Sequence, residues 1–168
     1  MKIFLIGFMG CGKTTLGKKL AYILKHQFID LDSCIEEQEG KTISQIFQED
    51  GEDYFRNLER VYLNRIIEKE DVVISTGGGT PCFFDNMDQM NENGKTIYIN
   101  MHPKELLPRL LSSSSKRPLL SGIYEKEMLD YVFKTIRSRE KYYYKAKIVV
   151  MGSKLTARKL EKFCFRED

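Results

Sequence analysis

The chain has 168 residues, of which 42% are hydrophobic and 30% are charged, and its formal net charge is +3. This length suits a single domain, residues 1–168, and the composition is typical of a soluble globular protein. No apolar stretch approaches the length of a membrane span, and the basic residues are too scattered to indicate a nucleic-acid ligand. We therefore expect neither a membrane nor a nucleic-acid partner.

The cysteines indicate a reducing environment. None of Cys11, Cys34, Cys82 and Cys164 forms a C-x-x-C pair, and no histidine lies near them at the spacing of a zinc site. Free thiols in the cytoplasm are the simplest interpretation. Cys11 lies inside the glycine-rich loop described next, where the pKa of a thiol tends to fall, but we favour a space-filling role for it.

The first predicted elements are a strand, a glycine-rich loop and a helix. Residues 2–6 form an apolar run, residues 7–14 read Gly-Phe-Met-Gly-Cys-Gly-Lys-Thr, and residues 14–24 have apolar side chains at helical spacing. The octapeptide matches the phosphate-binding loop G-x-x-x-x-G-K-[ST]. In such loops, backbone N–H groups and the positive end of the next helix bind phosphate oxygens. The pattern predicts that Lys13 reaches the β- and γ-phosphates of a nucleotide and that Thr14 binds Mg²⁺.

Two aspartates lie at the end of the second predicted strand, residues 28–31, where the chain reads Asp30-Leu31-Asp32. Strand alternation would place Asp30 and Asp32 on one face, near the phosphate loop, because ligands gather at the carboxyl ends of parallel strands. One carboxylate could hold a water on Mg²⁺, and the other could accept a proton from an attacking hydroxyl. The alternative is a capping pair for a helix that begins near Ser33, but a cap seldom needs two carboxylates.

The next predicted helix, residues 52–69, carries Arg56 and Glu59 on one face. The two side chains could form a solvated salt bridge of little energetic value. Alternatively, Glu59 could orient the guanidinium of Arg56 to bind a substrate carboxylate. The spacing alone does not choose between these interpretations.

A triple glycine, residues 77–79, follows the third predicted strand, residues 72–75. Ordinary turns use one or two glycines, so three indicate unusual backbone angles or a close approach to a ligand. At the carboxyl end of a strand in a protein with a phosphate loop, the triple glycine predicts backbone contact with a substrate.

The rest of the chain continues the alternation of strands and helices. We predict further strands at residues 96–100 and 148–151, and further helices at residues 103–111, 125–145 and 155–165. This alternation predicts an α/β fold with a parallel sheet covered on both faces. A serine-rich loop followed by Lys116 and Arg117 suggests a closing lid at about residues 112–124.

Taken in order, these motifs resemble those of the shikimate kinase family over nearly the whole chain. The resemblance is carried by residues 7–15, 30–32, 51–59, 75–79, 117–120 and 139–146. It implies a P-loop NTPase fold like that of nucleoside monophosphate kinases. Such a fold has a five-stranded parallel sheet flanked by helices, a substrate-binding helical region at about residues 32–60, and the lid.

The resemblance also implies a reaction, in which ATP with Mg²⁺ phosphorylates the 3-hydroxyl of shikimate during aromatic amino-acid biosynthesis. We expect a cytoplasmic enzyme that acts as a monomer. Its catalytic residues would be Asp32 as the base, with Lys13 and the lid residue Arg117 at the phosphates. Thr14, and Asp30 through water, would hold the metal.

The remaining implied roles concern ligand binding. Shikimate would be bound by Asp32, Arg56, Gly77, Gly78, Gly79 and Arg139. ATP would be bound by Gly10, Cys11, Gly12, Lys13, Thr14, Thr15, Arg109 and Arg117.

The chain departs from the family pattern at three places, one of which is Met151-Gly152-Ser153 after the last predicted strand, which gives little help in assigning adenine contacts. Lys141-Tyr142 stands where the family often has Pro-Leu, which leaves Arg137 as an alternative to Arg139, although alignment on Tyr143 favours Arg139. Cys11 replaces the usual alanine of the loop.

Two other functions are the alternatives. A gluconate kinase-like enzyme would also need a phosphate loop and an acid-binding site, but the triple glycine and the Phe55-Arg56 helix favour shikimate. A non-catalytic nucleotide switch is less favoured, because the Asn-Lys-x-Asp sequence of GTPases is absent and the strand at residues 72–75 ends in Ser75 rather than in an acid.

Overall fold

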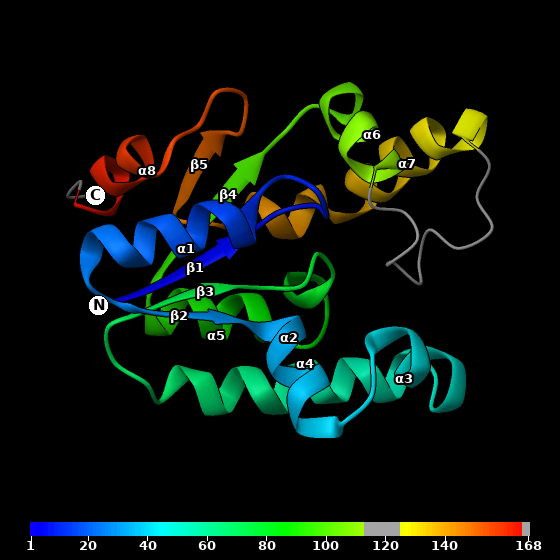
Figure 1. The fold of residues 1–168 in the computed structure, drawn as a ribbon, viewed down its shortest axis with the longest axis horizontal. Helices are drawn as coiled ribbons and strands as arrows, with labels where there is room; N and C mark the ends of the chain where they lie inside the picture. The colour runs from blue at the N-terminus through cyan, green and yellow to red at the C-terminus, as the bar shows by residue number, and fades with distance from the viewer. Residues whose placement is uncertain (113–124, 166–168) are drawn as a thin grey trace.

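The computed structural model describes residues 1–112 and 125–165, which form a five-stranded parallel sheet between helical layers (Figure 1). The strand order is β2-β3-β1-β4-β5, and every neighbouring pair is parallel. The strands are β1 (Lys2–Ile6), β2 (Gln27–Asp30), β3 (Val72–Ser75), β4 (Lys95–Asn100) and β5 (Ile148–Met151). The predicted α/β class and parallel sheet are confirmed, with strand ends that differ by at most one residue.

The α-helices of the described residues are α1 (Lys13–Leu24), α2 (Leu31–Glu39), α3 (Ile43–Glu49), α4 (Glu52–Ile67), α5 (Asn86–Asn93), α6 (Pro103–Leu111), α7 (Glu125–Tyr143) and α8 (Ala157–Cys164). A short 3₁₀ helix, η1 (Thr80–Cys82), follows the triple glycine. None of the described helices has the length and apolar character needed to cross a membrane.

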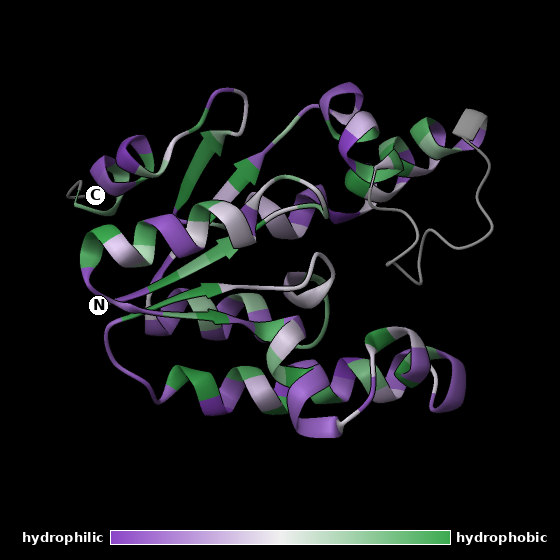
Figure 2. Ribbon diagram, viewed as in Figure 1, coloured by the Kyte–Doolittle hydropathy of each residue, from purple (hydrophilic) through white to green (hydrophobic). Residues whose placement is uncertain are grey.

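The two faces of the sheet carry separate hydrophobic clusters. In β1, Ile3 and Leu5 pack into the layer that contains α1 and α8, whereas Phe4 and Ile6 pack into the layer that contains α4 and α5. Because both faces are covered, central strands are almost continuously apolar, as expected for a parallel sheet. Figure 2 shows β1 as hydrophobic after its first residue, Lys2, whereas hydrophobic and hydrophilic residues alternate along α4.

The sheet order places a ligand site beside β1. The chain leaves β1 through α1 and reaches β2 and β3 on one side, whereas β4 and β5 lie on the other side. Strand order therefore changes direction at β1, and open parallel sheets bind ligands at such a point, beyond the carboxyl ends of the strands. The loops after β1 and β3 and the start of α2, which follows β2 directly, all reach this edge.

The structure corrects the explanation given for the two aspartates. The strand β2 ends at Asp30, and Leu31 is already the first residue of α2, so Asp32 is a helical residue and strand alternation does not apply to it. Asp30 is the N-cap of α2, and its carboxylate accepts a hydrogen bond from the Ser33 amide at 3.4 Å. The capping alternative is thus correct for Asp30, which also faces the cavity described below.

The elements that the sequence patterns missed are short. Sequence analysis did not place α5 or η1, and it gave no separate bounds for α2 and α3, which lie in the predicted helical region at about residues 32–60. The helix α3 carries a capping box, in which the side chains of Thr42 and Gln45 bond to each other's backbone amides, and this signal was available in the sequence. The predicted lid residues 113–124, with Arg117, lie outside the described residues.

Candidate active site

A cavity of about 570 Å³ opens at the carboxyl edge of the sheet. Its walls come from the loops after β1 and β3, from the ends of β2 and β3, and from α1, α2, α3, α4, α6 and α7. It brings together most of the predicted site residues: Gly10, Gly12, Lys13, Thr14, Thr15, Asp30, Asp32, Arg56, Gly77, Gly78, Gly79, Arg109 and Arg139. Of the predicted set, Cys11 does not line this cavity, and Arg117 lies outside the described residues.

The phosphate loop has the backbone shape that its glycines allow. Gly7, Gly10 and Gly12 have φ values of 141°, 83° and 99°, which favour glycine over any other residue. At Gly7, an added Cβ would also lie 2.8 Å from the carbonyl oxygen of Ile99. The helix α1 then begins at Lys13 without a side-chain cap or an acidic residue in its first turn. Its first N–H groups and positive dipole end therefore suit an anion.

Lys13 lies folded over the loop. Its Nζ donates hydrogen bonds to the carbonyl oxygens of Gly7 at 2.8 Å and Phe8 at 3.2 Å, and the residue is buried. The side chain of Cys11 is also buried and belongs to the hydrophobic core, with its Sγ 3.9 Å from Lys13 Nζ. The space-filling interpretation of Cys11 therefore agrees with its position.

A group of oxygen atoms lies at the start of α1. The Thr14 hydroxyl donates to Asp30 Oδ2 at 2.7 Å and lies 3.4 Å from the Ser75 hydroxyl. Hydroxyl and carboxylate oxygens are hard ligands of the kind that Mg²⁺ prefers, so these residues fit a metal site. Sequence analysis missed Ser75 as a site residue, although a polar residue at the end of an apolar strand was a usable signal.

Asp32 has the electrostatics of a proton acceptor. Burial, together with the negative charges of Glu59 and Asp30, raises the pKa of Asp32 to about 7 against the opposing effect of Lys13 and Arg56. Its Oδ1 is buried, and no hydrogen-bond partner for this atom exists among the described residues. A carboxyl group that titrates near neutral pH in a cavity is a candidate general base.

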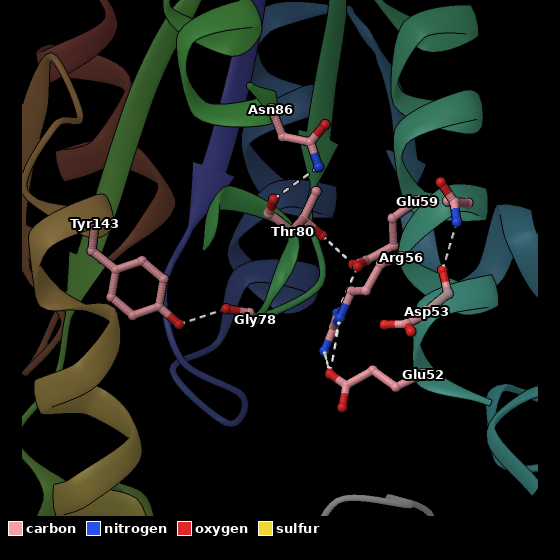
Figure 3. A network of polar contacts seen from close by, with 9 residues as sticks. Glu52, Asp53, Arg56, Glu59, Gly78, Thr80, Asn86 and Tyr143 are labelled. Atoms are coloured by element: carbon pink, nitrogen blue, oxygen red, sulfur yellow. Dashed lines mark hydrogen bonds and ion pairs between the residues drawn. The ribbon is translucent and has the colours of Figure 1, made fainter. Parts of the chain in front are cut away.

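Arg56 is held in place by two carboxylates, shown in Figure 3, and by an aromatic ring. Glu52 accepts hydrogen bonds from Nε at 3.1 Å and Nη2 at 2.8 Å, and Glu59 accepts one from Nη1 at 2.6 Å. The guanidinium carbon lies 4.2 Å from the centroid of the Phe83 ring. A guanidinium has five N–H donors, so one donor on each terminal nitrogen is left for another acceptor.

Glu59 extends this network toward the triple glycine. The Thr80 hydroxyl also donates to Glu59, and the Thr80 carbonyl accepts from Asn86 Nδ2 at 3.0 Å (Figure 3). The side chains of Arg56 and Glu59 are only 4% and 1% exposed. The pair is therefore a buried, hydrogen-bonded ion pair and not the solvated salt bridge that sequence analysis left open.

Crowding requires glycine at positions 77 and 79, whereas an added Cβ at Gly78 would lie 3.4 Å from its nearest neighbours, an ordinary contact. An added Cβ would lie 2.6 Å from Glu59 Oε1 at Gly77 and 2.5 Å from Arg56 Nη1 at Gly79, closer than real Cβ contacts. None of the three glycines has a left-handed φ. A left-handed backbone is therefore not the reason for these glycines. The groups that approach Gly77 and Gly79 most closely are side chains of this chain, and close approach to a ligand stays a prediction.

Arg139, on α7, faces the same cavity. Its guanidinium carbon lies 5.8 Å from the centroid of the Phe8 ring, and its Nη1 is buried with no hydrogen-bond partner in the described part of the chain. Arg137 is exposed and does not line the cavity. The structure therefore brings Arg139, and not Arg137, to the site. Across the cavity, Arg109 of α6 donates to the Gly10 carbonyl at 3.3 Å.

Fold and site together define the class of protein. A parallel sheet that leads from β1 into a phosphate loop, with two arginines in the same cavity, is the arrangement of a P-loop NTPase of the nucleoside monophosphate kinase type. Residues 9–164 match the family model described as shikimate kinase. The chain belongs to the shikimate kinase family, and it is a phosphotransferase enzyme.

Curated relatives and solved structures agree with this family assignment. The chain is 49% identical to the shikimate kinase of Phocaeicola vulgatus over 154 residues, which cover 92% of this chain and 88% of the relative. The crystal structure of shikimate kinase from Bacteroides thetaiotaomicron superposes with a TM-score of 0.92 at 43% identity, covering 97% of each chain. The Acinetobacter baumannii shikimate kinase, solved in complex with shikimate, has a TM-score of 0.87 at 32% identity and covers 96% of this chain and 89% of its own.

Proposed function

We propose that the cavity is the active site at which this chain transfers the γ-phosphoryl group of ATP to the 3-hydroxyl of shikimate, giving ADP and shikimate 3-phosphate. The observation that carries the assignment is that one cavity joins a phosphate loop to a buried carboxyl group and two arginines. The first part suits a nucleotide, and the second suits a small hydroxy acid. The Acinetobacter relative in complex with shikimate supports this acceptor.

The nucleotide half is assigned to the loop after β1. Amides of Gly10, Cys11 and Gly12, and those of the first turn of α1, would bind the phosphates of ATP. Cys11 would contribute through its backbone, because its side chain lies in the core. Lys13 would exchange its carbonyl partners for phosphate oxygens, and Arg109 lies at the edge where the adenosine half would bind.

The metal would be held by the oxygen atoms beside α1. Thr14 would bind Mg²⁺ directly and Asp30 through water, since their oxygens are already 2.7 Å apart. The ion would neutralise charge on the phosphates. In the structure Thr14 donates its hydroxyl proton to Asp30, so this hydrogen bond orients the hydroxyl lone pairs away from the carboxylate and toward the cavity.

The acceptor half is assigned to α4, α7 and the triple glycine. Arg56 and Arg139 would bind the carboxylate of shikimate, Arg56 through the terminal N–H groups that Glu52 and Glu59 leave free. Backbone groups of Gly77, Gly78 and Gly79 would contact the ring hydroxyls. These contacts would hold the 3-hydroxyl in line with the γ-phosphoryl group.

Asp32 would accept the proton as the new bond forms. The hydroxyl oxygen attacks the γ-phosphorus, the bond to the β-phosphate bridging oxygen breaks, and the hydroxyl proton passes to Asp32. Lys13 would neutralise charge on the phosphates during the transfer, and Arg117 would add to it from a lid at about residues 112–124. Exclusion of water by such a lid would prevent hydrolysis of ATP.

We also propose that the enzyme is a cytoplasmic monomer. All four cysteines are free thiols, which suits a reducing compartment.

A coupled assay of ADP release tests the assignment. With Mg²⁺ and ATP, the wild-type chain should release ADP when shikimate is added and should be inactive without an acceptor. Lys13→Ala should abolish this turnover, while Lys19→Ala, an exposed lysine of the same helix, should not. Equal ADP release with gluconate, or without acceptor, would contradict the proposed function.

A further inference from the structure

One hydrogen bond links α7 to the triple glycine from behind the cavity. The Tyr143 hydroxyl donates to the carbonyl oxygen of Gly78 at 2.6 Å (Figure 3). The Tyr143 ring is fully buried and packs on Tyr98, with the ring centroids 5.0 Å apart. Burial raises the pKa of the Tyr143 hydroxyl, with the nearby charge of Arg139 opposing it, so the group stays protonated and remains a donor.

This bond fixes the orientation of one peptide group. The described peptide bonds are all trans, and in a trans peptide the C=O of one residue and the N–H of the next point in opposite directions. Because the Gly78 carbonyl points to Tyr143, the Gly79 N–H points away from α7. Figure 3 shows Tyr143 and Arg56 on opposite sides of this loop. The Gly79 N–H has no backbone acceptor among the residues that the structure describes.

The neighbouring peptides are held by other means. The Gly77 carbonyl accepts from the Thr80 amide at 3.3 Å, and the Gly79 carbonyl accepts from the Cys82 amide at 2.8 Å. The Gly78 carbonyl is the one that depends on a side chain. Glycine has no Cβ to restrict rotation, so without an acceptor bond this peptide could turn over at little steric cost.

Tyr143 also lies next to the arginine of α7 that faces the cavity. Arg139 and Tyr143 are four residues apart and share one face of the helix. An added Cβ at Gly78 would lie 3.4 Å from Arg139 Nη1, so the loop and the guanidinium are near neighbours. The bond from Tyr143 to the loop therefore also sets how closely Arg139 approaches it.

We propose that Tyr143 is a positioning residue for the acceptor. Its hydrogen bond to Gly78 aims the Gly79 N–H at the acceptor and holds Arg139 against the same loop. Tyr143 itself touches neither the acceptor nor the nucleotide. This inference rests on the proposed function, since it assigns the cavity side of the loop to shikimate.

The variant Tyr143→Phe tests the proposal, because it removes the hydroxyl and keeps the ring that packs on Tyr98. The KM for shikimate should rise about fivefold to tenfold, as expected for the loss of one hydrogen bond. The KM for ATP and the kcat should stay within about twofold. The matched control is Tyr144→Phe, because the exposed hydroxyl of Tyr144 accepts from Asn100 at 3.0 Å outside the cavity. Its kinetic constants should not change.

A second measurement does not depend on activity. In ¹⁵N-labelled protein, the amide of Gly79 should shift and exchange faster in Tyr143→Phe than in wild type, while the amide of Gly40 should not. An unchanged Gly79 amide, an unchanged KM for shikimate, or equal increases in both KM values would overturn the proposal and leave Tyr143 a packing residue. A different outcome would contradict the proposed function instead. In that outcome, the Gly79 amide changes between wild type and Tyr143→Phe, but the wild-type protein does not use shikimate.

Discussion

Arg56 and Glu59 form a buried ion pair, with Nη1 of the arginine 2.6 Å from Oε2 of the glutamate and both side chains almost inaccessible to solvent. The same guanidinium also binds Glu52, whose side chain is 49% exposed. One arginine therefore has two carboxylate partners on one helix that differ mainly in burial. Because solvent screens exposed charges, the two contacts should differ in energetic value.

Substituting Glu59→Gln should destabilise the protein and weaken acceptor binding. The substitution leaves a buried guanidinium without its closest charge, and breaking such a pair costs about 3 kcal/mol or more. We expect the free energy of unfolding in urea to fall by about this amount and the KM for shikimate to rise at least about tenfold, because Arg56 loses its orientation. In Glu52→Gln, the matched control, the loss of stability should stay below about 1 kcal/mol. Equal losses in both variants would show that burial does not decide the strength of these contacts.

The two arginines of α7 should respond differently to truncation. Arg139→Ala should raise the KM for shikimate by about a hundredfold, since a charge-assisted contact contributes about 1.5–3 kcal/mol. The KM for ATP should change little. Arg137→Ala is the control of equal charge, because Arg137 is exposed and lies off the cavity. A larger effect of Arg137→Ala on the KM would contradict the assignment of Arg139.

The activity should depend on pH through Asp32. Because its pKa is raised to about 7, the carboxyl group is ionised and able to accept a proton only above that pH. We expect kcat/KM for shikimate to fall as the pH is lowered through about 7. Asp32→Asn should reduce kcat by about a hundredfold or more, and its residual activity should lack this acid limb. If kcat/KM of Asp32→Asn still falls at low pH with the same midpoint as wild type, the titration belongs to another group.

The same substitution should stabilise the protein at neutral pH. The folded state holds the Asp32 proton more tightly than the unfolded state, in which the pKa is near 3.8. The contribution of Asp32 to the free energy of unfolding is therefore lost as the pH rises from about 4 to 7. This loss is roughly 4 kcal/mol at most. Asp32→Asn should then unfold at a higher Tm than wild type at pH 8 and at a similar Tm at pH 4. A difference that does not grow with pH would be inconsistent with the raised pKa.

Removing the Thr14 hydroxyl should weaken the response to Mg²⁺. In Thr14→Ala, the concentration of Mg²⁺ that gives half-maximal ADP release should rise at least about tenfold, because one oxygen ligand and the partner of Asp30 are lost. Thr14→Ser keeps the hydroxyl and should respond like wild type. The test is a Mg²⁺ titration at fixed ATP, and an unchanged midpoint in Thr14→Ala would remove Thr14 from the metal site.

Local features of the fold were predictable from the sequence because their causes are local. The strands β1, β3 and β5 begin and end where the apolar runs do, and the phosphate loop is one contiguous octapeptide. Short helices without a clear apolar stripe were not predictable in this way. In α5, Met87 and Met90 are the only apolar side chains, and both are buried by tertiary packing.

Site residues were predictable mainly through the family resemblance. Spacing placed Arg56 and Glu59 on one face but could not say whether that face was buried, because burial depends on what packs against it. The contacts between distant residues had no sequence signal at all. Thr14 and Ser75, or Gly78 and Tyr143, are more than 60 residues apart and meet because of the strand order and the placement of α7.

The sequence by itself predicted a phosphate-binding loop after β1, since the glycines, Lys13 and Thr14 of the loop form one local unit. Only the tertiary structure decided the chemistry opposite that loop. It buries Asp32 beside other carboxylates, which shifts its pKa to about 7, and it crowds the triple glycine with Glu59 and Arg56. Dielectric environment and contacts across the sheet are properties of the folded chain, so no local pattern of residues could contain them.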